Sequence, residues 1–132
     1  MFIGSMKILT PIDFQSIATA KAEYGLVAYG GKIVTGRIWD ATIRPVVRIT
    51  TEYGWDIVCS PEQVFMLDEG VGMCTAAELK GKRLRRDMRA FGDRRSVLIT
   101  NVKDGGEEPV YRFSVPKGEW GIVEGFVVRG IE

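Results

Sequence analysis

The sequence predicts one all-β domain, and three observations lead to this prediction. Short runs of apolar and β-branched residues recur along the chain, separated by Gly, Asp and Pro. Its 132 residues suit a single domain that buries a core of its own. With 45% hydrophobic residues, 27% charged residues and a net charge of +1, the composition is that of a folded globular protein. We therefore expect residues 1–132 to form one antiparallel β domain with one or two short helices.

The first half of the chain predicts a short helix followed by strands. Phe14, Ile17 and Ala18 would share one helical face, which predicts a helix over 12–22. Turn signals then bound four runs with strand composition. The strands are expected at 26–29, 33–39, 45–51 and 55–59.

The second half predicts more strands and one short helical stretch, at 75–79. Two strand-like runs, 96–102 and 110–115, flank Asp104, Gly105 and Gly106, which predicts a hairpin turning at the two glycines. The tail predicts two more short strands around Gly125.

Residues 80–95 form a basic band, with eight Lys or Arg against two Asp. One interpretation is a surface for nucleic acid or for an acidic protein, since clustered cations release counterions from phosphates. The other is a solvated loop, and Phe91 is the only aromatic in the band that could stack on a base. We expect an exposed loop here, and the binding candidates in it are Lys82, Arg83, Arg85 and Arg86.

Several function classes lack the residues that they need. The chain has no histidine and no Cys-x-x-Cys pair, so we expect neither a metal site nor a cofactor. No apolar run approaches the ~18 residues of a membrane span, and the first residues lack the basic region and continuous apolar core of a secretory leader, so we expect a cytoplasmic protein without membrane contact. Cys59 and Cys74 are expected to be free thiols.

Four blocks in sequence order resemble the Hint family, the hedgehog and intein autoprocessing domains. The opening "MFIGSMKILTPIDFQSIA" looks like the family's first block, and "TTEYGWDIVCSPEQVFML" looks like the second. "DEGVGMCTAAELKGKRL" is similar to the stretch that follows, and "EPVYRFSVPKGEWGIVEGFVVRGIE" is similar to the two closing blocks. The resemblance implies a horseshoe of antiparallel strands in which residue 1 and Gly130 lie side by side.

The resemblance also implies which residues occupy the family's catalytic positions. The nucleophile position falls on Met1, whose thioether cannot attack a carbonyl. The Thr and His that assist the first cleavage fall on Ser60 and Gln63, and an amide exchanges no proton near neutral pH. The penultimate His and terminal Asn fall on Arg129 and Gly130, so no side chain can cyclise. A degenerate, non-catalytic site is expected, in a free-standing protein of bacterial or phage origin.

Three functions then compete. We favour a protein-binding or self-associating module, in which Trp120 and Arg129 form a binding patch at the former cleft, because Trp and Arg are enriched in binding hot spots. Core packing is the alternative role for Trp39, Trp55 and Trp120. Nucleic-acid binding by the basic band ranks second. Residual self-processing ranks last, with Cys59 as a displaced nucleophile, because a thiol beside Ile57 and Val58 is expected to be buried and unreactive.

Overall fold

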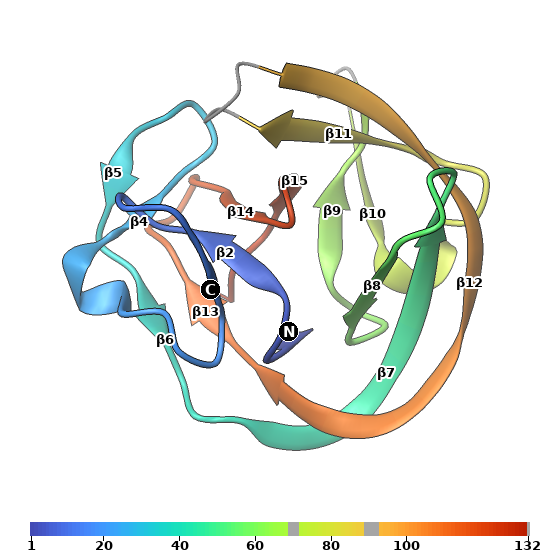
Figure 1. The fold of residues 1–132 in the computed structure, drawn as a ribbon, viewed down its shortest axis with the longest axis horizontal. Coiled ribbons are helices and arrows are strands. Elements are labelled where there is room, and N and C mark those ends of the chain that lie inside the picture. Colours follow the sequence, from blue (N-terminus) through green and yellow to red (C-terminus); the bar gives the residue numbers. More distant parts are fainter. Residues whose placement is uncertain (69–71, 89–92, 132) are drawn as a thin grey trace.

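The computed structural model describes residues 1–68, 72–88 and 93–131, and it is built almost entirely from antiparallel strands (Figure 1). Two short 3-10 helices, η1 (Ala22–Tyr24) and η3 (Ala76–Glu78), interrupt the strands. The strands are β1 (Phe2–Ile3), β2 (Lys7–Leu9), β3 (Phe14–Ser16), β4 (Leu26–Val27), β5 (Ile33–Val34), β6 (Arg37–Ile38), β7 (Thr42–Thr51), β8 (Asp56–Cys59), β9 (Val64–Met66), β10 (Met73–Thr75), β11 (Arg83–Met88), β12 (Asp93–Tyr111), β13 (Phe113–Ser114), β14 (Gly121–Val123) and β15 (Phe126–Val128).

One large sheet runs through most of these strands. Its order is β1-β8-β7-β12-β11-β15-β14-β2-β3, with β9 paired to β10 and β15. The pairs β13–β6 and β4–β5 form two small separate sheets. The long strands β7 and β12 curve around one side of the molecule, and the short strands β2, β14 and β15 lie inside this curve (Figure 1). β1 pairs with both β8 and β12, so the amino-terminal strand is held by segments from the middle and the end of the chain.

Four buried phenylalanines join the two ends of the chain in one core. Phe2 packs edge-to-face on Phe65 with ring centroids 6.1 Å apart, and it lies 6.5 Å from Phe113. Phe65 in turn lies 6.5 Å from Phe126 on β15. Each such pair of aromatic rings stabilises the folded protein by about 0.5–1.5 kcal/mol, in addition to the stabilisation that comes from burying apolar area. The core therefore fixes β1, β9, β13 and β15 around the point where the chain ends meet.

The all-β fold class predicted from the sequence is confirmed. The predicted strand 45–51 lies within β7, and residues 56–59 of the predicted strand 55–59 form β8. The tail forms the hairpin β14–β15, in which Glu124 and Gly125 both have positive φ. The stretch predicted as helical at 75–79 contains η3.

The predicted helix at 12–22 is wrong. Residues Phe14–Ser16 form β3, which pairs with β2 in the register Lys7↔Ser16 and Leu9↔Phe14. The Thr10 hydroxyl accepts hydrogen bonds from the backbone N–H groups of Ile12 and Asp13 and so closes a turn ahead of β3. Ile17 is buried and Ala18 is exposed, so the apolar spacing that fits a helix is used by a strand and the bend after it.

The predicted hairpin at Gly105 and Gly106 is also wrong, because β12 continues through both glycines. Val47 pairs with Asp104 and Pro45 with Glu107, so two glycines on β12 lie opposite Val46 alone, which is a β-bulge. A Cβ on Gly105 would lie 3.0 Å from the Val46 side chain, and Gly106 has a φ of 79°. A bulge and a tight turn both require glycine, and here the partner strand β7 runs past the site without reversing.

The exposed loop expected at 80–95 is replaced by paired strands. β11 pairs with β12 from Arg83↔Leu98 to Met88↔Asp93, and Arg86 also pairs with Phe126 on β15. Residues 89–92 lie outside the described part of the chain. The alternation in "RLRR" places Leu84 in the core, fully buried, while the arginines around it carry the polar positions. The high charge of the band concealed this strand.

No helix in the described segments has the length and apolar character needed to cross a membrane.

Candidate functional site where the chain ends meet

The two ends of the chain lie side by side, as expected. Met1, Ser60, Gln63, Arg129 and Gly130 all line one pocket of about 120 Å³, which we call the junction pocket. The sequence therefore predicted the residues that gather at this place. Both chain ends lie near the middle of Figure 1, inside the curve of β7 and β12.

The local sequence explains how the junction pocket forms. β8 ends at Cys59, and Ser60 donates its backbone N–H to the Met1 carbonyl at 2.9 Å, which extends the β1–β8 pairing by one residue. A turn at Pro61 follows, because proline favours a turn after a strand, and Gln63 donates its N–H back to the Ser60 carbonyl at 3.1 Å. On the other side, Arg129 donates its N–H to the Val64 carbonyl at 3.0 Å.

The Gln63 side chain bridges the two chain ends. Its Oε1 accepts a hydrogen bond from the Met1 amino group, and its Nε2 donates to the Arg129 carbonyl at 2.8 Å. Nε2 also lies 3.2 Å from the Val64 carbonyl, and the Ser60 hydroxyl accepts from the Met1 amino group at 3.2 Å. Gln63 and Ser60 are both buried, with 6% and 1% of their surface exposed. An amide suits this place because it donates and accepts at once without carrying charge.

Burial changes the titration of two groups at the junction. Loss of hydration lowers the pKa of the Met1 amino group from 8.0 to about 6, although the nearby Cys59 and Glu62 favour its charged form. Burial likewise raises the pKa of the Cys59 thiol from 9.0 to about 12. At neutral pH the amine is mainly neutral and Cys59 is a thiol, not a thiolate. Cys59 is buried, as expected, and its burial keeps it in the thiol form.

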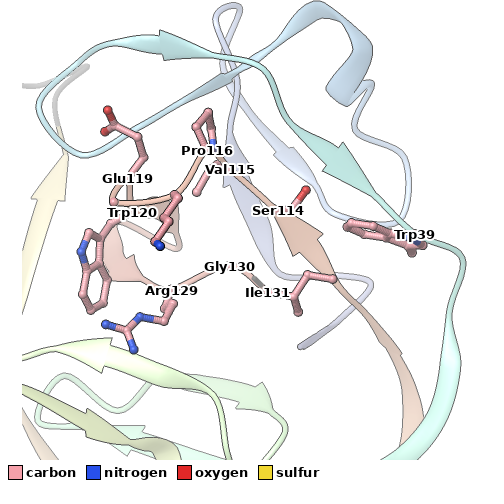
Figure 2. A pocket seen from close by; sticks show the side chains of 11 residues that line it. Trp39, Ser114, Val115, Pro116, Glu119, Trp120, Arg129, Gly130 and Ile131 are labelled. Carbon is pink, nitrogen blue, oxygen red and sulfur yellow. The ribbon is translucent and has the colours of Figure 1, made fainter.

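A larger pocket of about 560 Å³ lies beside the junction pocket, and we call it the Trp39–Trp120 pocket (Figure 2). It shares Arg129, Gly130 and Ile131 with the junction pocket. The segment between β13 and β14 supplies another wall, and Trp39 lies across from Trp120. Its lining comprises Trp39, Ser114, Val115, Pro116, Lys117, Gly118, Glu119, Trp120, Arg129, Gly130 and Ile131.

Arginines stack on the tryptophans of this pocket. The Arg129 guanidinium lies 4.9 Å from the centre of the Trp120 ring, so the predicted pair of Trp120 and Arg129 forms one patch. Arg37 lies 4.4 Å and Arg112 5.6 Å from the Trp39 ring. Trp55 is different, because it packs on Phe126 at 5.7 Å beneath Arg86, which agrees with a core role.

Sequence reasoning did not place Trp39, Lys117 or Ile131 at the same site as Trp120. The turn "VPKGEW" is the sequence signal that could have predicted this site. It connects two strands that both lie near the chain ends, so the turn should lie beside the junction pocket. Lys117 and Glu119 both line the pocket, and Glu119 forms an ion pair with Lys32 at 2.9 Å.

The binding candidates of the basic band lie elsewhere, on β11. Arg85 donates to the Tyr29 hydroxyl at 2.7 Å, and Arg86 donates to the Glu124 carbonyl at 3.0 Å. Arg83 lies 3.7 Å from the Glu52 carboxylate, with about half of its side chain exposed. Lys82 precedes the strand and is exposed. Arg83, Arg85 and Arg86 therefore contact other residues of the same chain.

The described residues contain no group of three or more His, Cys, Asp or Glu side chains that could hold a metal ion. Both cysteines are free, Cys59 in the core and Cys74 partly exposed on β10.

The fold is that of several solved inteins. A crystal structure of the gp41-1 intein superposes on this chain with a TM-score of 0.78 at 16% identity, over 98% of both chains. A DnaB intein from Synechocystis sp. PCC 6803 superposes with a TM-score of 0.79 at 17% identity, over 99% of this chain and 98% of that one. The MchDnaB-1 intein gives 0.74 at 16% identity, over 98% and 100%. The chain thus has the Hint fold implied by its four sequence blocks.

No protein-family model matches the sequence, and the search of curated proteins gave no match.

Replacing Gln63 with leucine is expected to destabilise the protein. Gln63→Leu keeps the size of the side chain but leaves the Met1 amino group and the Arg129 carbonyl without this partner. A buried polar group without a partner costs about 1–3 kcal/mol, so we expect the free energy of unfolding in urea to fall by about 2–4 kcal/mol. Gln15→Leu is the matched control on β3 and should change it by less than about 0.5 kcal/mol. Equal losses in both variants would show that the bridge does not hold the ends.

Stability is expected to rise as the pH increases from 6 to 8. The folded pKa of the Met1 amine is about 6 and the ordinary value is 8.0, so the unfolded chain binds more protons between these pH values. The free energy of unfolding should rise by on the order of 2 kcal/mol between pH 6 and 8 and change little outside this range. The sequence has no histidine to titrate there. Thermal unfolding at several pH values measures the gain, and a chain acetylated at Met1 should not show it. A rise of the same size in the acetylated chain would assign it to another group.

Proposed function

We propose that the chain is a non-splicing protein of intein fold that binds a peptide segment of a partner protein in the Trp39–Trp120 pocket. The single observation that carries this proposal is that pocket, which opens directly beside the point where the chain ends meet. Inteins of this fold act on the segments that flank them. In the part of the chain that the structure describes, this pocket is suited to holding a segment, and Met1, Ser60 and Gln63 at the junction support a loss of cleavage.

The chemistry at the junction supports a loss of splicing. Protein splicing needs a nucleophile at the first residue and groups that transfer protons, and Met1, Ser60 and Gln63 occupy the junction. The sequence contains no histidine that could act as the acid or base. The pKa of Cys59 is raised to about 12 by burial, which opposes its use as a displaced nucleophile. Gln63 uses its amide to tie the ends together.

The character of the larger pocket supports peptide binding. Its volume of about 560 Å³ falls in the range of ordinary ligand sites, about 300–1,000 Å³. Two tryptophans, Val115, Pro116 and Ile131 supply apolar walls, and Arg129 and Lys117 supply donors. Trp and Arg side chains carry a large share of the binding energy in protein interfaces.

Nucleic-acid binding, and self-association as a form of the proposed binding, have less support. Binding of nucleic acid by the basic band would need its arginines to leave the contacts that Arg85 and Arg86 make with Tyr29 and Glu124. Self-association would use the same pocket for a segment of a second copy, and sedimentation of the purified protein distinguishes this from a foreign partner.

Flanking tags should remain attached to the chain. We expect a fusion with tags at both ends to keep a single intact mass during long incubation with thiol or hydroxylamine, because Met1 supplies no nucleophile and the Gln63 amide cannot supply the positioned acid or base that contributes about 10²- to 10⁴-fold to such steps. Intact-mass spectrometry measures this. Thiol-dependent release of a tag that Cys59→Ala abolishes would show that splicing chemistry survives.

Selection of random dodecapeptides on the immobilised protein should enrich binders that depend on the pocket. We expect the enriched peptides to lose their binding to the double variant Trp39→Ala, Trp120→Ala by at least tenfold, because these rings form the apolar walls. Tyr53→Ala removes an exposed aromatic from the β7–β8 turn and is the matched control. Peptides that bind the double variant as well as the original protein would place the binding surface elsewhere.

A further inference from the structure

Positive charges outnumber carboxylates among the described residues on and around the Trp39–Trp120 pocket. Among the residues that the structure describes, no carboxylate lies within ion-pair distance of Arg129 or Lys117, and Glu119 is already paired with Lys32. Arg37 and Arg112 add two guanidinium groups at the Trp39 end. The pocket thus combines apolar walls with a surplus of positive charge, and a ligand that complements it carries negative charge beside an apolar group.

The Arg129 side chain offers planar donors at the edge of the pocket. Its guanidinium carbon lies over the Trp120 ring, 4.9 Å from the ring centre, and a guanidinium holds its N–H groups in one plane as a rigid fork. A carboxylate accepts two of these N–H groups in parallel, a geometry that a lysine could not offer. Figure 2 shows the Arg129 guanidinium beside Trp120, at one side of the pocket, with Trp39 and Ile131 toward the other side. An acidic side chain and an apolar side chain close in sequence would therefore reach both parts.

We infer that the Trp39–Trp120 pocket recognises an extended peptide segment in which a Glu or Asp lies next to an aromatic or aliphatic residue. Arg129 binds the carboxylate, and Trp39, Trp120 and Ile131 enclose the apolar side chain. The inference rests on the proposed peptide-binding function and names the class of peptide.

A single-stranded nucleic acid would complement this site less well. Such a strand binds along a positively charged groove that follows its backbone, with several bases stacked in a row. The lining of this pocket has two cations, Lys117 and Arg129, which suit one carboxylate better than a run of phosphates.

Defined peptides test the inference by NMR. The probe is the end-blocked peptide Gly-Ser-Glu-Phe-Glu-Ser-Gly, and its relatives carry Gln for both Glu, Lys for both Glu, or Ala for Phe. The indole N–H signals of Trp39 and Trp120 report on the pocket, and that of Trp55, under Arg86, is the internal reference. We expect the Glu peptide to shift the first two signals alone, and the other three peptides to bind at least tenfold more weakly.

Variants of the protein complete the test. Arg129→Gln should lower the affinity for the Glu peptide to that for the Gln peptide, and Arg129→Lys should fall between because it keeps the charge without the planar donors. Arg44→Gln removes an exposed charge from β7, outside the pocket, and should leave the affinity unchanged. The unshifted Trp55 signal confirms that each variant is folded.

Three outcomes would overturn the inference. Equal affinity for the Glu and Gln peptides would remove the acidic preference while the peptide-binding function stands. Larger shifts with an eight-nucleotide poly-dT strand would assign the pocket to nucleic acid. No shift with any of these peptides, when randomly selected peptides do bind through Trp39 and Trp120, would show that the pocket takes another class of peptide.

Discussion

The meeting of the chain ends depends on one side chain, because the largely buried Gln63 satisfies polar groups from both ends of the chain. Without it, β1 would be held by its strand pairing and by Phe2, and the segment after β15 by the backbone bond from Arg129 to Val64. Because the Gln63 amide is neutral, its hydrogen bonds to the two chain ends do not depend on its own protonation. A side chain that exchanged protons would make these hydrogen bonds depend on pH.

The junction pocket and the Trp39–Trp120 pocket share a wall, residues 129–131, and this links binding to the arrangement of the chain ends. A ligand that contacts the Arg129 side chain on one face touches a residue whose carbonyl is held by Gln63 on the other. Ile131 donates its N–H to the Phe113 carbonyl at 2.9 Å, so the shared wall is also fastened to β13. The rigid backing of this wall favours binding, because little order has to be gained when a ligand arrives.

The sequence predicted the fold class, most strand positions and the gathering of Met1, Ser60, Gln63 and Gly130, because alternating residues and block order are local signals. The prediction from the sequence failed where the same local pattern is compatible with two different structures. Glycine is required by a turn and by a bulge alike, and only the course of β7 past Val46 distinguishes them. The spacing of Phe14 and Ile17 fits a helix until β2 offers a strand to pair with. Trp39 reaches Trp120 through tertiary packing alone, which no local pattern records.

The pairing of β1 with β12 bears on how the chain folds during synthesis. Phe2 leaves the ribosome 109 residues before its partner Tyr111, a delay on the order of ten seconds. Until Tyr111 emerges, β8 can pair with one edge of β1 while the other edge lacks its partner, and contacts between such distant residues form slowly. The nascent chain thus presents an open β edge during this delay, and this is the period in which a chaperone or a neighbouring nascent chain would have access to it.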